Sequence, residues 1–354
     1  MSLAEHARGL DAAHPVGPLP GNGRPLPDDA AHRTRRAVPE PDPRMRGAAA
    51  ADLLADYFAA PHGDVARLEA ALHAVDIPYR KNDHVHSVAL RADPDLVLST
   101  GRRLVEHGQD RCGVSIGLAL LAVHRLPPET VEVVLTIGLL SETFAPLAAE
   151  ALVRARGGHL HLHRLAERSA GWGRVTYVED LLRWGGSQRD WLLRHACDGD
   201  FRNGYFAGAV ALRASLHEAI TRESADDALI DHTGRLLHVM SYATGMGIDL
   251  AGYPPAPLVL AAWVRHLSGQ EATGERASVA IALSHELRSR EPARVGCTPE
   301  ERTAVLDGLD RVLERSDWVV AAAEEIDWST EWTRWMIDNC HLPIALRERV
   351  EGAR

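Results

Sequence analysis

Lysine and aromatic residues are scarce in this chain of 354 residues. Lys81 is the only lysine among 39 basic residues, and 49 acidic residues give a net charge of −10 at pH 7. A charge of this sign disfavours general attraction to DNA, RNA or anionic lipid, so we expect no nucleic-acid partner. Aromatic residues make up only 5% of the chain, which argues against the aromatic-lined pocket that holds a carbocation in terpene synthases.

Cysteines are few and far apart, at Cys112, Cys197, Cys297 and Cys340. No two of them form a C-x-x-C motif, which argues against a zinc knuckle or a redox pair. Scattered cysteines in a chain of this length are typical of reduced, mostly buried thiols in a cytosol.

Long apolar runs are also lacking. The longest, around residues 116–123 and 258–264, are far shorter than the roughly 20 residues that span a bilayer. Residues Met1–Leu10 carry charges in place of the apolar stretch of a signal peptide. We therefore expect a cytoplasmic protein with no membrane partner, and the oligomeric state stays open.

The N-terminal residues differ in composition from the remainder. Residues 1–46 contain eight of the 20 prolines and no aromatic residue. Such a segment has little apolar surface to offset the entropy of ordering, so it is predicted to be a disordered, Pro-rich tail. Residues 47–93 are expected to form an N-terminal helical cap with an irregular loop. Within that cap, residues 77–92 look non-helical, with a short extended segment around Val85, Ser87 and Ala89.

Apolar residues recur with helical period over most of the remaining chain, which predicts an all-α fold. The predicted helices form pairs separated by glycine or proline breakers. The pairs are 94–107 with 112–123, 128–140 with 143–155, 159–168 with 172–184, 188–197 with 202–219, and, less regularly, 226–242 with 256–268. A two-helix unit that recurs roughly every 30 to 40 residues is typical of a stacked α-solenoid. We therefore expect HEAT-like repeats over residues 94–290 and an acidic, Trp-rich helical cap over 291–354.

Four short motifs lie in the centre of the repeats: Gly171-Trp172-Gly173-Arg174, Glu179-Asp180-Leu181, Trp191-Leu192-Leu193-Arg194 and Asn203-Gly204-Tyr205-Phe206-Ala207. This region resembles the central segment of uncharacterised bacterial HEAT-repeat proteins. The resemblance implies an α-solenoid and supplies no activity. Arg174, Glu179 and Arg194 fall off the apolar stripes, where they either pair across neighbouring helices or line the concave face.

Histidine is abundant, with 19 residues, and His159, His161 and His163 alternate with leucine. On a helix, His159 and His163 share a face at a spacing that can chelate zinc. The glutamate of an H-E-x-x-H motif is missing and no third ligand can be named. We therefore predict no metal and no cofactor, with His159 and His163 as the only, weak, metal candidates.

Two acidic stretches resemble metal motifs. Asp226, Asp227 and Asp231 have the spacing of the magnesium motif of all-α terpene synthases. The second metal motif of those enzymes is missing, and the acids suit a helix N-terminus, with Ser224 and Asp227 placed as in a capping box. The stretch from Asp198 to Gly204 departs from a calcium loop and is better interpreted as an inter-helix turn with Asp200 as N-cap.

The C-terminal residues 298–354 hold 13 acidic residues against seven arginines, together with Trp318, Trp328, Trp332 and Trp335. The last three fall at i, i+4 and i+7, which is one face of a helix. Such a stripe either packs a terminal helix onto the last repeat or forms an aromatic, acidic docking surface for a basic partner.

No complete catalytic set is present, and G-x-S-x-G, Walker and G-x-G-x-x-G motifs are lacking. The sequence therefore favours a non-catalytic binding or scaffold protein that holds a protein or peptide in a solenoid groove, such as an adaptor or an immunity factor. The candidate partner-binding residues are Trp172, Arg174, Glu179, Arg194, Asn203, Tyr205, Trp328, Trp332 and Trp335.

Two alternatives remain open. One is a HEAT-like DNA-binding protein or alkylated-base DNA glycosylase, with Trp184, Asp190 and Trp191 around the lesion. The other is a metal-dependent all-α enzyme that uses His159 and His163.

Overall fold

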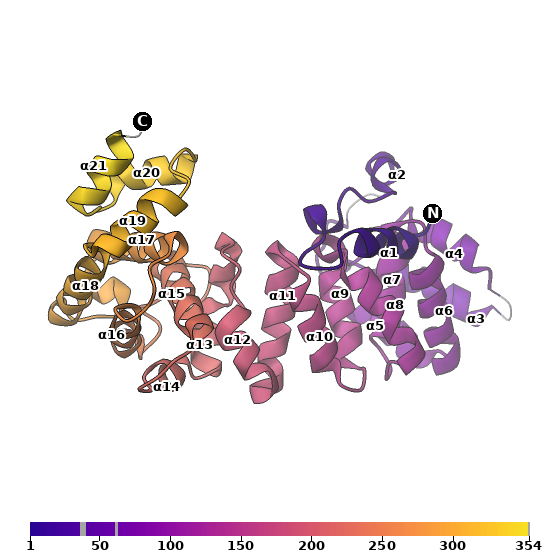
Figure 1. Cartoon of the computed structure of the whole chain (residues 1–354). Coiled ribbons are helices and arrows are strands. Elements are labelled where there is room, and N and C mark those ends of the chain that lie inside the picture. The colour runs from indigo at the N-terminus through magenta and orange to yellow at the C-terminus, as the bar shows by residue number, and fades with distance from the viewer. Residues whose placement is uncertain (36–39, 61–62, 353–354) are drawn as a thin grey trace. The chain divides into compact units, whose positions relative to one another are not determined.

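The computed structural model describes residues 1–35, 40–60 and 63–352, and their regular structure is entirely helical (Figure 1). The predicted all-α class is therefore confirmed. The chain divides into two compact units, Met1–Trp184 and Gly185–Arg354, which are described separately. None of the helices in the described residues is both long and apolar enough to cross a membrane.

The helices of the first unit are α1 (Leu3–Ala13), α2 (Asp29–Thr34), α3 (Ala48–Ala59), α4 (Val65–Leu72), α5 (Asp83–Arg91), α6 (Pro94–His107), α7 (Arg111–Leu121), α8 (Pro128–Gly138), α9 (Ser141–Val153), α10 (Gly158–Glu167) and α11 (Gly171–Leu181). A 3₁₀ turn, η1 (Pro20–Gly23), precedes α2, and a second, η2 (Leu182–Gln188), follows α11. Helices that follow one another in the sequence lie side by side, as α6 with α7, α8 with α9 and α10 with α11 (Figure 1). The predicted helix pairs of this unit are confirmed to within a few residues.

The α6–α7 pair shows why these helices form and pack closely. Asp93 caps α6 by accepting a hydrogen bond from the Leu96 N–H, and Pro94 occupies the first turn, where no N–H is needed. Gly101 and Gly117 face each other across the pair, and a Cβ atom at either position would lie about 3 Å from the other's carbonyl oxygen. The two backbones therefore pack closer than larger residues would allow.

A buried tyrosine joins two successive pairs. The Tyr177 hydroxyl of α11 donates a hydrogen bond to the carbonyl oxygen of Gly138, at a distance of 2.8 Å. Gly138 is the last residue of α8, so its carbonyl is one of those that a helix end leaves without a helical partner. The bond satisfies this carbonyl inside the core.

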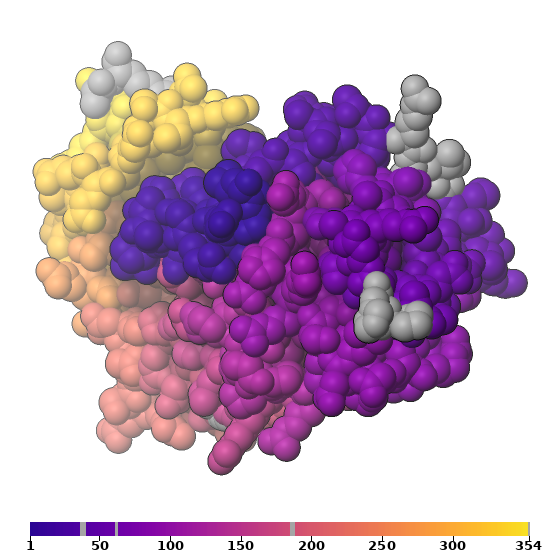
Figure 2. All heavy atoms as spheres, turned by 90° about the vertical axis from the view of Figure 1, so that its right-hand side faces the viewer, coloured from indigo at the N-terminus to yellow at the C-terminus, as the bar shows by residue number. Residues whose placement is uncertain are grey.

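The structure does not confirm the disordered tail expected over residues 1–46. Helix α1 begins with a capping box between Ser2 and Glu5, and it buries Leu3, Ala4 and Ala7 against α6 and α8. Figure 2 shows the N-terminal residues, coloured indigo, lying on the surface of this unit. A few small apolar side chains and long-range polar bonds hold this segment against the first unit. Composition alone does not reveal such contacts, so it underestimates the order of the segment.

Arginines from later helices supply those polar bonds. Arg168 donates to the carbonyl oxygens of His14 (2.6 Å) and Gly17 (2.7 Å), and its Nη1 lies 2.9 Å from the Asp11 carboxylate. Arg111, at the start of α7, binds Asp28 and Asp29. The N-terminal segment is therefore fastened to the unit at two separate points.

The extended segment expected within residues 77–92 is wrong, because residues 83–91 form α5. The Asn82 side chain accepts hydrogen bonds from the His84 and Val85 N–H groups and so starts the helix. Val85 and Ala89, four residues apart, are both buried on its inner face. The alternation of small and polar residues in this stretch conceals a one-sided helical pattern.

The second unit contains α12 (Arg189–His195), α13 (Ala207–Arg213), α14 (Leu216–Ile220), α15 (Asp227–Tyr242), α16 (Ala256–Leu267), α17 (Gly274–Ser289), α18 (Pro299–Leu313), α19 (Ser316–Glu325), α20 (Glu331–Asn339) and α21 (Ile344–Gly352). Two 3₁₀ turns, η3 (Phe201–Tyr205) and η4 (Pro292–Val295), lie between them. The single helix expected over 202–219 is instead divided into η3, α13 and α14. Ser215, with φ 51°, causes the second break because a left-handed residue cannot continue an α-helix.

The core of this unit is centred on α15. Trp263 of α16 is fully buried and donates from Nε1 to the Ile230 carbonyl oxygen, 3.0 Å away. Its ring lies against Gly234, where a Cβ atom would be 2.7 Å from the indole. Helices α15 and α16 can therefore meet at this point only through a glycine.

Candidate functional site

Two exposed tryptophans stand on helix α20. Trp332 and Trp335 stack with ring centroids 4.9 Å apart and an angle of 14° between the ring planes. Their exposed fractions are 49% and 37%. Thr333, Met336 and Ile337 are the buried residues of α20, so other side chains anchor the helix and this tryptophan pair remains in contact with solvent.

Trp335 is also fixed by a neighbouring helix. The His285 ring of α17 meets it edge-on, with centroids 5.1 Å apart and an angle of 79°. Trp335 stacks on Trp332 and is also contacted edge-on by His285. These two contacts fix its orientation, so the tryptophan pair presents a prearranged aromatic surface.

The prediction that Trp328 shares a helix face with this pair is wrong. Trp328 precedes α20, which Thr330 caps by accepting a hydrogen bond from the Thr333 N–H. The Trp328 indole instead donates to the Ala322 carbonyl oxygen at the end of α19, 3.0 Å away. The Thr330 cap interrupts the helix that the spacing implied.

Acidic side chains flank the tryptophan pair. Glu331 and Asp338 are exposed on α20 at helical spacings of four and three residues from Trp335, so they share its face. Arg334, next to this face, donates from Nε to the Thr330 carbonyl oxygen, 3.3 Å away. The surface is therefore aromatic in the centre and mainly acidic at its edges.

The same unit has an open apolar groove between α16 and α18, with a volume of about 670 Å³. Leu258, Val264 and Val305 line it, with Arg265 and Arg311 also in the lining. Leu258 is 55% exposed there.

The candidate residues on α11 have different surroundings. Trp172 and Glu179 are exposed, whereas Arg174 is buried and donates to the carbonyl oxygens of Ala166 (3.1 Å) and Ser169 (3.2 Å). Arg174 thus holds the end of α10, which favours the structural interpretation of this residue.

In the second unit, Arg194 and Asn203 also have structural bonds. Arg194 binds Asp226 with a shortest distance of 2.7 Å, and Asp226 in turn caps α15. Asn203 is buried and exchanges hydrogen bonds with Asp198. Tyr205 is exposed on η3, at the far end of this turn.

The acidic stretches are held by polar bonds within the protein. Arg276 of α17 pairs with Asp227 at 3.1 Å and with Asp231 at 2.7 Å. Asp226, rather than Ser224, caps α15. The interpretation of residues 198–204 as a turn is confirmed, because Asp200 caps η3.

The residues named for the two alternative functions lie on α10, η2 and α12. Trp191 is buried in α12, and exposed Asp190 pairs with Arg194 at 3.5 Å. His159 lies against Trp184, with ring centroids 5.6 Å apart, and His163 pairs with Glu167 at 3.5 Å. Neither histidine belongs to a group of three metal-ligand side chains within the described residues.

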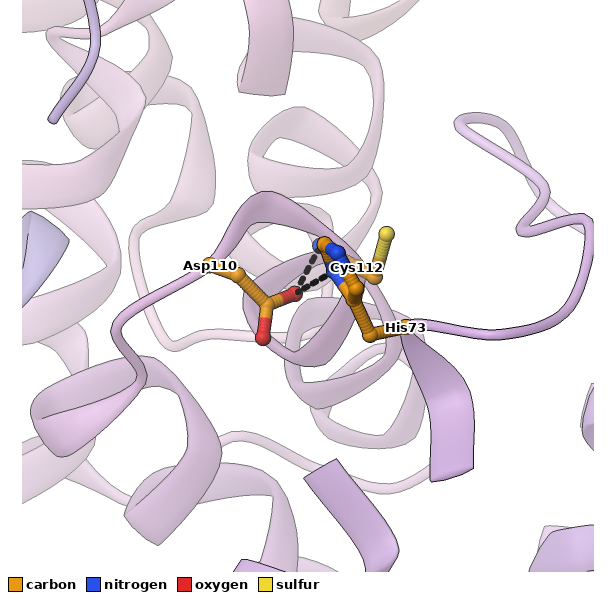
Figure 3. Close-up of side chains that lie close together, drawn as sticks. All are labelled: His73, Asp110 and Cys112. Atoms are coloured by element: carbon orange, nitrogen blue, oxygen red, sulfur yellow. Dashed lines mark hydrogen bonds and ion pairs between the residues drawn. The ribbon is translucent and has the colours of Figure 1, made fainter. Parts of the chain in front are cut away.

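One group with metal-ligand geometry does occur in the described residues, and sequence reasoning missed it. His73, Asp110 and Cys112 bring one ligand atom each to within 4.8 Å of the others (Figure 3). Burial raises the pKa of the Cys112 thiol to about 11, although Arg35 opposes this shift. Asp110 and Cys112 form an Asp-x-Cys pair in the sequence, but nothing links that pair to His73, 37 positions earlier.

Comparisons of the chain with protein-family models, with curated proteins and with solved structures found no match.

Proposed function

We propose that this is a non-catalytic binding protein, built from HEAT-like helix pairs, that holds a protein or peptide partner. The observation that carries the proposal is the stacked, solvent-exposed Trp332–Trp335 pair on α20. Large aromatic side chains dominate the binding energy of many protein interfaces, and a prearranged pair loses little entropy on binding. A role as an adaptor or as an immunity factor would use such a surface.

The HEAT-like architecture is part of the same proposal. Its support is the succession of neighbouring helix pairs from α6 to α11 and the tyrosine bond that joins α11 to α8. Repeats of this kind carry binding surfaces rather than dedicated chemistry.

The partner's contacting segment should be basic. Glu331 and Asp338 flank the tryptophan pair, and the C-terminal 57 residues carry 13 acidic residues against seven arginines. An arginine or lysine of the partner would lie over an indole ring while the flanking carboxylates attract its charge. A cation–π contact contributes about 0.5–1 kcal/mol at an exposed site and more when water is excluded.

The test compares the wild type with a Trp332→Ala/Trp335→Ala double variant. Affinity capture from cells identifies candidate partners, and calorimetry with the purified partner then measures binding. The double variant should weaken the Kd by about tenfold or more, and added salt should weaken wild-type binding. Trp184→Ala, which removes another exposed tryptophan, is the matched control and should bind as the wild type does.

Two results would contradict the proposal. Unchanged affinity in the double variant, with binding lost in Leu258→Glu, would place the partner in the α16–α18 groove instead. If the partner contacts this surface through an acidic segment, or if the partner is a nucleic acid, the proposed charge complementarity is excluded.

A further inference from the structure

We propose that His73, Asp110 and Cys112, together with His32, bind a zinc ion in the first unit (Figure 3). Imidazole nitrogen, carboxylate oxygen and thiolate sulfur are the ligands that zinc takes in proteins. The four side chains come from three places in the fold. His32 is in α2, His73 is the C-cap of α4, and Asp110 and Cys112 begin α7.

The distances between ligand atoms suit a tetrahedral ion. With metal–ligand bonds of about 2.0–2.3 Å, neighbouring ligand atoms of a zinc tetrahedron lie about 3.3–3.6 Å apart. His73 Nδ1 is 3.7 Å from Asp110 Oδ1, and His32 Nδ1 is 3.8 Å from Cys112 Sγ. These two separations are within a few tenths of an ångström of the tetrahedral range. The ligand atoms of His73, Asp110 and Cys112 all lie within 4.8 Å of one another, and His32, which is outside this group, would have to turn toward them to complete the site.

The most informative atom is His73 Nδ1. It is buried and has no hydrogen-bond partner, and its separation from Asp110 is too long for a hydrogen bond. A buried polar atom without a partner is costly and calls for an explanation such as an ion. A metal ion between His73 and its neighbours would satisfy this nitrogen.

Two of the ligands are held in place by the start of α7. The Asp110 carboxylate accepts hydrogen bonds from the N–H groups of Cys112 (2.8 Å) and Gly113 (3.1 Å). The Cys112 side chain is 1% exposed, so its position is set by packing. Preorganised ligands lower the entropy cost of binding a metal.

His32 is brought to the group by an ion pair. Asp28 and Asp29, just before His32 in the sequence, bind the Arg111 guanidinium. The ring of His32 then lies edge-on to that of His73, with centroids 6.3 Å apart. The Asp28–Arg111 pair therefore positions the proposed fourth ligand beside the other three.

The surroundings supply charge balance and a path for entry. One thiolate and one carboxylate would neutralise Zn²⁺, and the thiol would release its proton to solvent on binding. Arg35 Nη1 already donates to Cys112 Sγ at 2.9 Å, which is the kind of outer contact that orients a metal-bound sulfur. An open cavity of about 370 Å³, lined by His32, Arg35 and Cys112 among others, reaches two of the proposed ligands.

The proposed ion would be structural. With His32 as the fourth ligand, side chains would fill all four tetrahedral positions, whereas a catalytic zinc keeps one position open for water or substrate. Its effect would be to join the N-terminal segment to α4 and α7.

The test uses the full-length chain, stripped of metal with a chelator and then titrated with Zn²⁺ and Co²⁺. We expect one Zn²⁺ per chain, bound at the expense of a competing chelating dye. Co²⁺ should give the intense visible bands of a four-coordinate site and a thiolate-to-cobalt charge-transfer band.

Variants then identify the ligands. Cys112→Ser should abolish the charge-transfer band, and Cys112→Ser and His73→Asn should each weaken Zn²⁺ binding by more than about 100-fold. His32→Asn should weaken it and open the fourth position, which changes the visible bands. Cys340→Ser, which alters another buried cysteine, should leave all these properties unchanged.

The proposal is overturned if the wild type binds no stoichiometric metal, or if Cys112→Ser and His73→Asn bind it as the wild type does. Circular dichroism of each metal-free variant shows whether it is folded. Should one variant fail to fold, the other and the cobalt spectrum of the wild type still decide the question.

Discussion

Replacing Asp28 by alanine should release α2 from the start of α7, while Arg168 still holds the residues after α1. The Asp28 carboxylate accepts three hydrogen bonds from Arg111, from the backbone N–H (2.8 Å), from Nε (2.9 Å) and from Nη2 (2.8 Å). Asp110 satisfies the next two N–H groups of α7, so Asp28 completes the capping of this helix. Asp28→Ala therefore removes an ion pair and a helix cap together.

The size of the effect follows from burial. The side chains of Asp28 and Arg111 are only 3% and 13% exposed, so water screens their attraction little. Breaking a buried pair typically costs about 3–5 kcal/mol. Because Arg111 keeps Asp29 as a partner, we expect a loss of about 2–3 kcal/mol.

The pH dependence of this pair has a definite sign. Burial alone would raise the pKa of Asp28, but the hydrogen bonds from Arg111 outweigh it, and the pKa lies below its ordinary value. The contribution to stability is therefore complete above the ordinary aspartate pKa of about 3.9 and is lost as the pH falls below it. In Asp28→Ala this acid-sensitive part should disappear.

Hydrogen exchange measures the effect locally, which matters in a chain with two units. A loss of 2–3 kcal/mol predicts roughly 30- to 150-fold faster exchange of the Arg111 amide and of the amides of α2, with little change in α1, which Arg168 and its own packing hold. The control is Asp317→Ala, because the Arg315–Asp317 pair is 39% and 49% exposed. An exposed pair is worth at most about 1 kcal/mol. Equal, small effects of the two variants would refute the reasoning from burial.

Two further predictions concern single side chains. Tyr177→Phe should lower the free energy of unfolding by about 1–2 kcal/mol without changing the urea m value, because it leaves the Gly138 carbonyl buried and unpaired; an unchanged urea midpoint would contradict this. Burial lowers the pKa of His238, although Glu286 opposes the shift, so the folded chain takes up a proton on this imidazole at a lower pH than the unfolded chain, which does so near pH 6.5. Stability should therefore fall as the pH drops from about 7 to 5, and His238→Phe should show a smaller fall in pH-dependent urea unfolding; equal slopes would exclude His238 as a source.

Helix positions could be predicted well where capping and apolar period agree. Asp93 and Pro94 start α6 and Gly108 follows its end, and the predicted bounds, 94–107, match the structure. These start and stop residues can be recognised in the sequence because each cap bonds to a backbone group no more than four residues away. The same reasoning failed over 83–91, where the Asn82 cap was overlooked and the buried face has only two strongly apolar positions.

The order of the N-terminal segment could not be predicted because its partners are remote. Asp28 meets Arg111 across 83 positions, and no local pattern reveals such a pair. Composition correctly reports that the segment is poor in apolar residues. It does not report that Leu3, Ala4 and Ala7 occupy a site prepared by α6 and α8.

For the candidate sites too, local features could be predicted from the sequence, whereas long-range contacts could not. Spacing on α20 placed Trp332 and Trp335 on one face, which the structure shows, but could not tell that Met336 and Ile337 make the buried face. The metal-ligand group brings His73 to Asp110 and Cys112 through the packing of α4 on α7. Such a meeting is a property of tertiary structure and leaves no motif in the sequence.

The fastening of the N-terminal segment by Arg168 has a consequence for synthesis on the ribosome. His14 leaves the exit tunnel 154 residues before the arginine that binds its carbonyl oxygen. At about 5–20 residues per second, the segment waits roughly 8 to 30 seconds for that arginine to emerge. The inner face of α1 is uncovered until α6 and α8 have emerged, and the polar bonds to Arg168 form later still, so nascent chains of this protein should be better substrates for chaperones and proteases than the finished molecule.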